Sequence, residues 1–197
     1  MLNNNSNDSS QKITENEISN NKSGEDIIIG NSYKFSEVKE RRNALLQLLT
    51  RSKQLCDADP EYRYMLEELE DFLKPRPGRN IIGLKSKLEE GNRLDLLEEG
   101  GFLENKFARR VSRGQFSISD EIIYFHCLSK INSSFTSYIK PLFKNTVDDA
   151  IIDRLIYEKI VIPLYEEVSE ASICVSVDLI RGMIFFLTGK CHLRWVS

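Results

Sequence analysis

Apolar residues recur every three or four positions along most of the chain after residue 36, which is the period of an α-helix with one buried face. The longest such face consists of seven residues: Ile118, Ile122, Phe125, Leu128, Ile131, Phe135 and Ile139. Shorter runs with this period predict further helices near 36–55, 60–73, 81–91, 94–111, 151–168 and 179–187. Because nearly every segment follows this period, we expect an all-α fold, a compact multi-helix bundle.

Four sites carry residues that typically begin helices: Asp59 followed by Pro60, Ser117 with Asp120 three positions later, the run 146–149, and Ser176. A Ser, Thr or Asp side chain at a helix N-cap accepts a hydrogen bond from a backbone N–H group of the first turn. Proline fits the first helical position because its missing N–H has no partner there in any case. We therefore expect helices to begin at these four sites.

Glycine and proline predict where the helices end or bend. The segment 74–79 contains two prolines and should stop a helix, and Pro163 should kink or split the helix around it. The pair Gly100-Gly101 costs about 2 kcal/mol relative to alanine inside a helix, so we expect a break or bend there. Gly91 and the pair Thr188-Gly189 are expected to close helices.

The first part of the chain has a different pattern. Residues 1–23 are mostly Asn, Ser, Lys, Glu and Gln with little to bury, which predicts a disordered tail; a remnant of cloning or truncation is the alternative. Residues 24–35 contain Ile27, Ile28 and Ile29 between glycines and predict a short extended arm, or equally a loop before the first helix. A lone strand needs a neighbour, which another chain can supply. The helical domain then covers 36–197.

Composition and charge narrow the classes of protein. The chain has 197 residues, of which 41% are hydrophobic, and a net charge of −3. This charge gives no support to a nucleic-acid or anionic-membrane partner. No apolar run approaches the roughly 18 residues of a membrane span, and the N-terminus lacks the apolar core of a secretory signal. We therefore expect a cytoplasmic protein without membrane contact.

The chain has four scattered cysteines: Cys56, Cys127, Cys174 and Cys191. Two adjoin the two histidines, as His126-Cys127 and Cys191-His192, which raises the options of a catalytic dyad or a Cys2His2 metal site. Adjacent residues on a helix point about 100° apart, so a useful pair would have to join the two segments. Since no CxxC pair or triad framework accompanies them, structural roles are favoured, and we expect no catalytic residue, metal or cofactor.

Two groups of glutamates are candidates for acid–base chemistry: Glu98, Glu99 and Glu104, and Glu166, Glu167 and Glu170. Paired carboxylates do such work when burial separates their pKa values. Both groups lie among other charged residues, which favours solvated helix faces.

Four basic residues recur at helical spacing: Lys106, Arg109, Arg110 and Arg113. This spacing places them on one helix face, where they could follow a phosphate backbone. Because acidic residues are plentiful and the chain is net negative, a solvated or protein-facing patch is favoured, with nucleic-acid contact indirect or weak. Nucleic-acid binding through this patch is the alternative function.

Several segments resemble, in the same order, motifs of one known family. Residues 81–91 (IIGLKSKLEEG) are similar to IGLxxKLxxG, and 104–110 (ENKFARR) to KExFAKK. Phe135, Ile139 and Pro141 match FxxxIxP, and 182–195 (GMIFFLTGKCHLRW) resembles GMxYxLTGxCHIxW. These motifs are those of a C-terminal domain of bacterial ABC-three-component systems, the Lamassu-like anti-phage defence group. The resemblance covers roughly 45–195.

The resemblance implies two partners, an SMC-like ABC ATPase and a small middle component of a defence complex. In the family an effector commonly precedes this domain, whereas here the tail stands in that position, which suggests a stand-alone assembly subunit. We therefore expect a non-enzymatic helical adaptor that docks on the ATPase, with Arg194, Trp195 and the arm residues Ile27, Ile28 and Ile29 as contacts. The alternative place for Trp195 is the core, where it would clamp the chain end. A homo-oligomer stays open, and a Cys–His hydrolase is the least favoured function.

Overall fold

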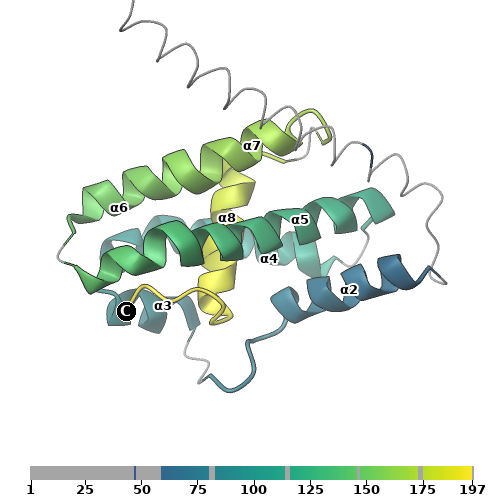
Figure 1. Cartoon of the computed structure of the whole chain (residues 1–197). Helices are drawn as coiled ribbons and strands as arrows, with labels where there is room; N and C mark the ends of the chain where they lie inside the picture. The colour runs from purple at the N-terminus through teal and green to yellow at the C-terminus, as the bar shows by residue number, and fades with distance from the viewer. Residues whose placement is uncertain are drawn as a thin grey trace, which may run out of the picture. The chain divides into compact units, whose positions relative to one another are not determined.

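The computed structural model describes residue 47 and residues 59–79, 83–113, 116–145, 147–172 and 175–196. The predicted tail at 1–23, the arm at 24–35 and nearly all of the first predicted helix lie outside these residues. Within the described residues the chain forms helices and the turns between them (Figure 1). The predicted all-α fold is therefore confirmed.

The α-helices follow the predicted order along the chain. They are α2 (Pro60–Leu73), α3 (Gly83–Glu90), α4 (Leu97–Ser112), α5 (Ile118–Ser134), α6 (Asp149–Ile156), α7 (Ile162–Val168) and α8 (Val177–Gly189). Shorter segments join some of them: the 3₁₀ turns η1 (Leu94–Leu96) and η3 (Lys140–Lys144), and the π-helical turns η2 (Phe135–Ile139) and η4 (Tyr157–Val161).

The last helix, α8, lies at the centre of the core. Asp178 and Arg181 are its two charged residues, and a helix that is apolar on nearly every side has to be buried. Figure 1 shows α8 crossing the long helices, and α3, α4, α5 and α7 all contact it. A Cβ atom at Gly182 would lie 2.6 Å from the carbonyl oxygen of Leu103, so α8 and α4 touch almost backbone to backbone.

The predicted helix starts are confirmed by their hydrogen bonds. The side chains of Asp59, Asp148 and Ser176 accept bonds from backbone N–H groups in the first turns of α2, α6 and α8. Ser117 and Asp120 form the expected reciprocal capping box at the start of α5. A cap depends on residues within one helical turn, which is why sequence alone located three caps to the residue and the fourth, Asp148, to within the run 146–149.

The predicted break at Gly100-Gly101 was wrong, because α4 continues through both residues from Leu97 to Ser112. The ring of Phe185 on α8 lies against Gly100, where a Cβ atom would come within 2.8 Å of the ring. Gly100 therefore makes room for a neighbouring helix, and the tertiary contact stabilises a segment that has low helix propensity.

The glycines predicted to close α3 and α8 are close to the helix ends, but other residues make the turns. Asn92 (φ 55°) and Cys191 (φ 66°) adopt the left-handed conformation. After α3 the N–H of Arg93 donates to the Leu88 carbonyl at 2.8 Å, the long bond of a Schellman motif. Gly91 has a packing role instead, since a Cβ atom there would collide with a residue of the C-terminus described below.

The two prolines in the second half of the bundle each follow a π-helical turn. Pro163 lies at the start of α7, directly after η4, and Pro141 lies at the start of η3, directly after η2. A proline removes one backbone N–H from the helical ladder, and the wider π turn is a known way to interrupt that ladder. Neither proline breaks the helical path: it runs from α6 through η4 into α7 past Pro163, which was expected to kink or split it, and it continues past Pro141 to Lys144.

Candidate functional site

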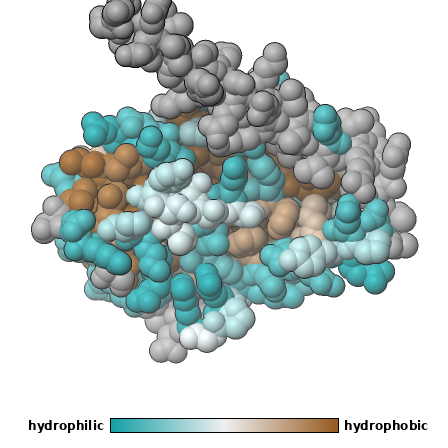
Figure 2. All heavy atoms as spheres, in the orientation of Figure 1, coloured by the Kyte–Doolittle hydropathy of each residue, from teal (hydrophilic) through white to brown (hydrophobic). Residues whose placement is uncertain are grey.

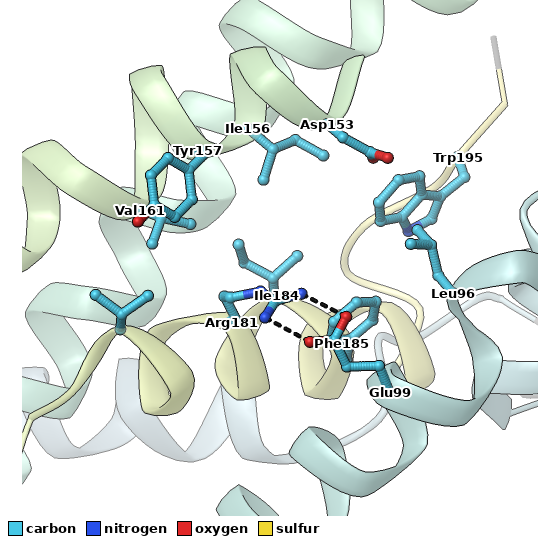
Figure 3. Close-up of a pocket in the computed structure, with 11 residues that line it drawn as sticks. Leu96, Glu99, Asp153, Ile156, Tyr157, Val161, Arg181, Ile184, Phe185 and Trp195 are labelled. Atoms are coloured by element: carbon cyan, nitrogen blue, oxygen red, sulfur yellow. Dashed lines mark hydrogen bonds and ion pairs between the residues drawn. The ribbon is translucent and has the colours of Figure 1, made fainter. Parts of the chain in front are cut away.

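A groove lies between the α6–η4 segment and α8, with the start of α4 and the C-terminus closing one end (Figure 3). Its volume is about 430 Å³. Eight of its lining residues are apolar or aromatic: Leu96, Ile156, Tyr157, Val161, Val177, Ile184, Phe185 and Trp195. Figure 3 shows Ile156 and Tyr157 across the opening from Ile184 and Phe185, so both walls are apolar. We call this feature the α8 groove.

A bidentate ion pair joins α4 to α8 within the groove. The Nη1 and Nη2 atoms of Arg181 donate to Oε1 and Oε2 of Glu99, each at 2.7 Å (Figure 3). The hydrogen bond from Arg181 lowers the pKa of Glu99, and the same bond raises the pKa of Arg181. Two parallel charge-assisted bonds fix both side chains in one geometry, so the charged part of the groove is ordered.

A buried arginine lies behind one end of the groove. The side chain of Arg93 is 1% exposed, and its Nη2 donates to both carboxylate oxygens of Asp153 at 2.8 Å. It also bonds Asp95 at 3.2 Å and lies 3.7 Å from Asp149, with its guanidinium 5.4 Å from the ring centroid of Trp195. Burial lowers the pKa of Arg93, but the hydrogen bonds to Asp95 and Asp153 outweigh it and raise the pKa. The guanidinium group of Arg93 therefore stays protonated inside the domain.

Residues 190–196 form a C-terminal strap that carries Trp195 into the core. Trp195 is 3% exposed, its Nε1 donates to Thr188 Oγ1 at 3.0 Å, and its ring meets Phe135 edge to face at 5.5 Å. A Cβ atom on Gly91 would lie 2.5 Å from the Cβ of Trp195. Trp195 is therefore buried in its alternative place, as a clamp on the chain end, and its expected contact with a partner stays a prediction.

The loop after α2 fastens the strap. Nη1 of Arg79 donates to the carbonyl oxygen of Cys191 at 2.5 Å, and Nε2 of His192 lies 2.9 Å from the carbonyl oxygen of Lys74, to which it donates. Burial lowers the pKa of His192, and the positive charges of Arg76 and Arg79 act in the same direction. The neutral imidazole is therefore the form that suits the folded strap.

The other residues predicted to contact a partner are in different situations. Arg194 is exposed beside the buried Trp195. Ile27, Ile28 and Ile29 lie outside the described residues, so the role of the arm stays a prediction.

The four basic residues predicted to share a helix face do lie together. They line a hollow of about 480 Å³ on α4, with Leu179 of α8 beside them: Lys106, Arg109, Arg110 and Arg113. Lys106 Nζ lies 3.6 Å from a carboxylate oxygen of Asp178, and the Arg110 guanidinium lies 5.6 Å from the ring centroid of Tyr124. We call this feature the basic hollow.

The Cys–His segments are parts of the scaffold. His126 Nε2 lies 3.0 Å from Glu167 Oε1, which joins α5 to α7, while Cys127 is fully buried. Burial raises the pKa of the Cys127 thiol far above its usual value, so the thiolate that nucleophilic chemistry needs is disfavoured. In the part of the chain that the structure describes, no group of three or more His, Cys, Asp or Glu could hold a metal ion.

The prediction of solvated glutamates was wrong for two residues. Glu167 is buried and pairs with His126, and Glu104 is half-buried beside α8, where burial raises its pKa. A signal for Glu167 was available, since it falls three residues after Leu164 and one before Val168 in the buried stripe of α7.

A comparison with known protein families matches the segment of the chain that contains the α8 groove and the basic hollow. A family model described as C-terminal domain 9 of the ABC-three component (ABC-3C) systems matches residues 83–195, more than half of the chain. The chain belongs to this family. No match was found among the curated proteins or among the solved structures. The family resemblance expected from the sequence is confirmed, and the chain is a component of an ABC-three-component defence system.

The ABC-3C domain runs from the start of α3 to Trp195. All residues that line the α8 groove and the basic hollow fall within it. None of the described helices is long and apolar enough to span a bilayer. Both surfaces are therefore features of the ABC-3C domain itself.

Sequence reasoning missed the Arg93 cluster in this ABC-3C domain. Asp149 and Asp153 are four residues apart and so share a helix face, which is a weak signal for a cation nearby. The partner, Arg93, lies more than fifty residues earlier in a turn between helices. Only the packing of α6 beside that turn brings them together.

Proposed function

We propose that this chain is a non-enzymatic, cytoplasmic adaptor of its ABC-three-component system, and that it docks on the SMC-like ABC ATPase together with the small middle component. The observation that carries the proposal is the α8 groove, an apolar recess at the surface of a domain from a multi-component system. Preformed apolar recesses with a few fixed polar groups are typical binding sites.

The surroundings of the groove support a binding role. Its wall on α8 consists of core side chains, and the Glu99–Arg181 pair and the Arg93 cluster fix its charged groups. A surface that is already ordered loses little entropy when a partner binds. The ion pairs of the groove therefore favour binding by an ordered surface.

The burial of the candidate nucleophile supports the absence of enzymatic activity. Cys127 is sequestered in the core, and the adjacent His126 is engaged with Glu167. Both side chains thus contribute to packing between α5 and α7. A domain that uses its reactive residues in this way fits assembly better than catalysis.

Co-purification tests the adaptor function. The full chain, tagged and expressed with the neighbouring genes of its system, should retain the ABC ATPase and the middle component through affinity purification and gel filtration. Elution of the chain alone, with the ATPase present in the lysate, would contradict the proposal. A Cys127→Ala variant that loses defence while it keeps its fold and its ATPase would contradict the non-enzymatic part.

A second candidate function is nucleic-acid binding at the basic hollow. The specific observation in its favour is that all four predicted basic residues border one recess on α4. Against it stand the pairing of Lys106 with Asp178 and the net charge of −3. We rank this function second for that reason.

Salt-dependent binding to duplex DNA tests the second candidate. If three or four phosphates are contacted, the logarithm of the binding constant should fall with the logarithm of salt concentration with a slope of about −3. Charge reversal at Arg109 and Arg113 should then abolish binding. Arg194→Glu is a control, since Arg194 is exposed outside the hollow. Binding that survives the double reversal would end this candidate.

A further inference from the structure

The α8 groove has room for side chains of another molecule. A cavity of about 150 Å³ is enough for a benzene molecule, so a groove of about 430 Å³ accepts roughly two or three apolar side chains. Tyr157 stands at its edge with 47% of its surface exposed, and Ile184 and Phe185 lie in its wall on α8 (Figure 3). An occupant with apolar groups would cover this aromatic and aliphatic surface.

The charges around the groove indicate the sign of the charge that an occupant should carry. Four carboxylates and two guanidinium groups are linked there by ion pairs: Asp95, Glu99, Asp149, Asp153, Arg93 and Arg181. Their net charge is −2, and the three of them that line the groove itself, Glu99, Asp153 and Arg181, have a net charge of −1. The carboxylates are between 45% and 58% exposed, whereas the two arginines are 1% and 29% exposed. An approaching molecule therefore meets carboxylates first, and cations are attracted to this surface.

We propose that the α8 groove binds a protein segment in which apolar side chains are flanked by lysine or arginine, and that this segment belongs to the ABC ATPase of the same system. The inference rests on the proposed adaptor function and adds the docking surface and the chemistry of the partner. The apolar side chains of the segment pack between Tyr157 and Phe185. Its cations lie beside Asp153 and Asp95, whose outward faces are exposed to water.

A second copy of this chain is a poorer occupant, although its basic hollow also carries cations. The groove and the hollow are both recesses, so neither can insert into the other. A contact between two different surfaces of identical chains is also head to tail, and such contacts give rings or open filaments and not two-fold dimers. A protruding segment of a different chain can insert into the groove, and its binding does not lead to rings or filaments.

Two tyrosines provide a matched test in the full chain expressed with its system. Tyr157→Glu places a negative charge at the edge of the groove, and Tyr165→Glu places the same charge on α7, outside the groove lining, at a residue 36% exposed. We expect Tyr157→Glu to reduce the co-purified ATPase at least about tenfold, as for a hot-spot tyrosine, and Tyr165→Glu to leave it within about twofold. Circular dichroism melting of both variants checks that the fold is intact.

A photo-crosslinker identifies the occupant. With p-benzoylphenylalanine in place of Tyr157, mass spectrometry of the illuminated complex should find an ATPase peptide that contains apolar residues and lysine or arginine. Crosslinking to a second copy of this chain, or to an acidic segment, overturns the inference. Full ATPase recovery with folded Tyr157→Glu overturns the groove as the docking surface while the adaptor function stands. Absence of the ATPase from the wild-type eluate overturns both.

Discussion

The α8 groove and the basic hollow have similar volumes, about 430 and 480 Å³, and both border α8, but they are built from different kinds of residue. The walls of the groove are side chains of the core, such as Val161, Ile184 and Phe185. The hollow is bounded by long basic side chains on the outer surface of α4. The shape of the groove is therefore part of the fold, whereas the shape of the hollow depends on side chains in contact with water.

The arginines of the two regions show the same difference. Arg93 behind the groove is enclosed by carboxylates from two segments and by the ring of Trp195. Arg109 in the hollow is exposed, and its Nε donates to the carbonyl oxygen of Asn105 on its own helix at 3.3 Å. Arg93 joins distant parts of the chain, whereas this hydrogen bond of Arg109 lies within its own helix, so charge alone does not reveal which residues hold the domain together.

The largest effect is expected at the wall of the groove. Trp195→Ala should lower the free energy of unfolding by about 3–5 kcal/mol, because it removes a buried ring and leaves a cavity beside Phe135 and Gly91. Urea denaturation followed by circular dichroism measures the change. Trp195→Phe, which keeps a ring but loses the hydrogen bond to Thr188, should cost less. Equal stability of the alanine variant and the wild type would show that the strap does not belong to the core.

A smaller loss is expected behind the groove. Arg93→Leu should lower the free energy of unfolding by about 2 kcal/mol, since it removes a buried hydrogen-bonded cation but leaves carboxylates that water can solvate. Arg109→Leu in the hollow is the matched control and should change stability by less than about 0.5 kcal/mol. Thermal unfolding of the two variants compares them directly. The distinction between the two regions fails if both variants lose the same stability.

Much of the fold could be predicted from the sequence because its signals are local. Caps at Asp59, Ser117 and Ser176 and the helical periodicity depend on residues within a turn or two. The continuity of α4 could not be predicted, since it depends on Phe185, which is far away in the sequence and lies against Gly100. Close approach between helices is a tertiary property that glycine propensity does not contain.

The candidate site was predicted less completely, for the same reason. The basic face of α4 follows from spacing along one helix, and the structure brings its four residues together. The α8 groove combines residues from four segments, and none of its charged residues was proposed for binding from the sequence. Trp195 was placed correctly only as an alternative, because one residue near a chain end carries no periodicity to show whether it is buried.

Acid pH should lower the stability of the folded chain through His192 in the C-terminal strap. The pKa of His192 is lower in the folded chain than its ordinary value of about 6.5, because burial disfavours the imidazolium. The unfolded chain therefore binds more protons below that pH, and stability falls as pH falls through the folded pKa. His192→Gln should reduce this fall, which the difference in melting temperature between pH 7.5 and 5.5 measures for the two proteins. Both proteins contain His126, so the two differ only at residue 192. An identical pH dependence of the melting temperature would therefore exclude His192 as a cause of the loss of stability.

The smallest effect on stability is expected in the basic hollow. Arg109→Glu combined with Arg113→Glu should lower the free energy of unfolding by at most about 1 kcal/mol, because both side chains are exposed and the reversal affects only their interaction with the C-terminal end of α4. Urea denaturation measures the change, with Trp195→Ala as the reference for a destabilised chain. A loss above about 1 kcal/mol would mean that the hollow, like the groove, is part of the packed structure. A neutral result leaves the hollow as a surface whose charges can be reversed without unfolding, which the nucleic-acid binding test requires.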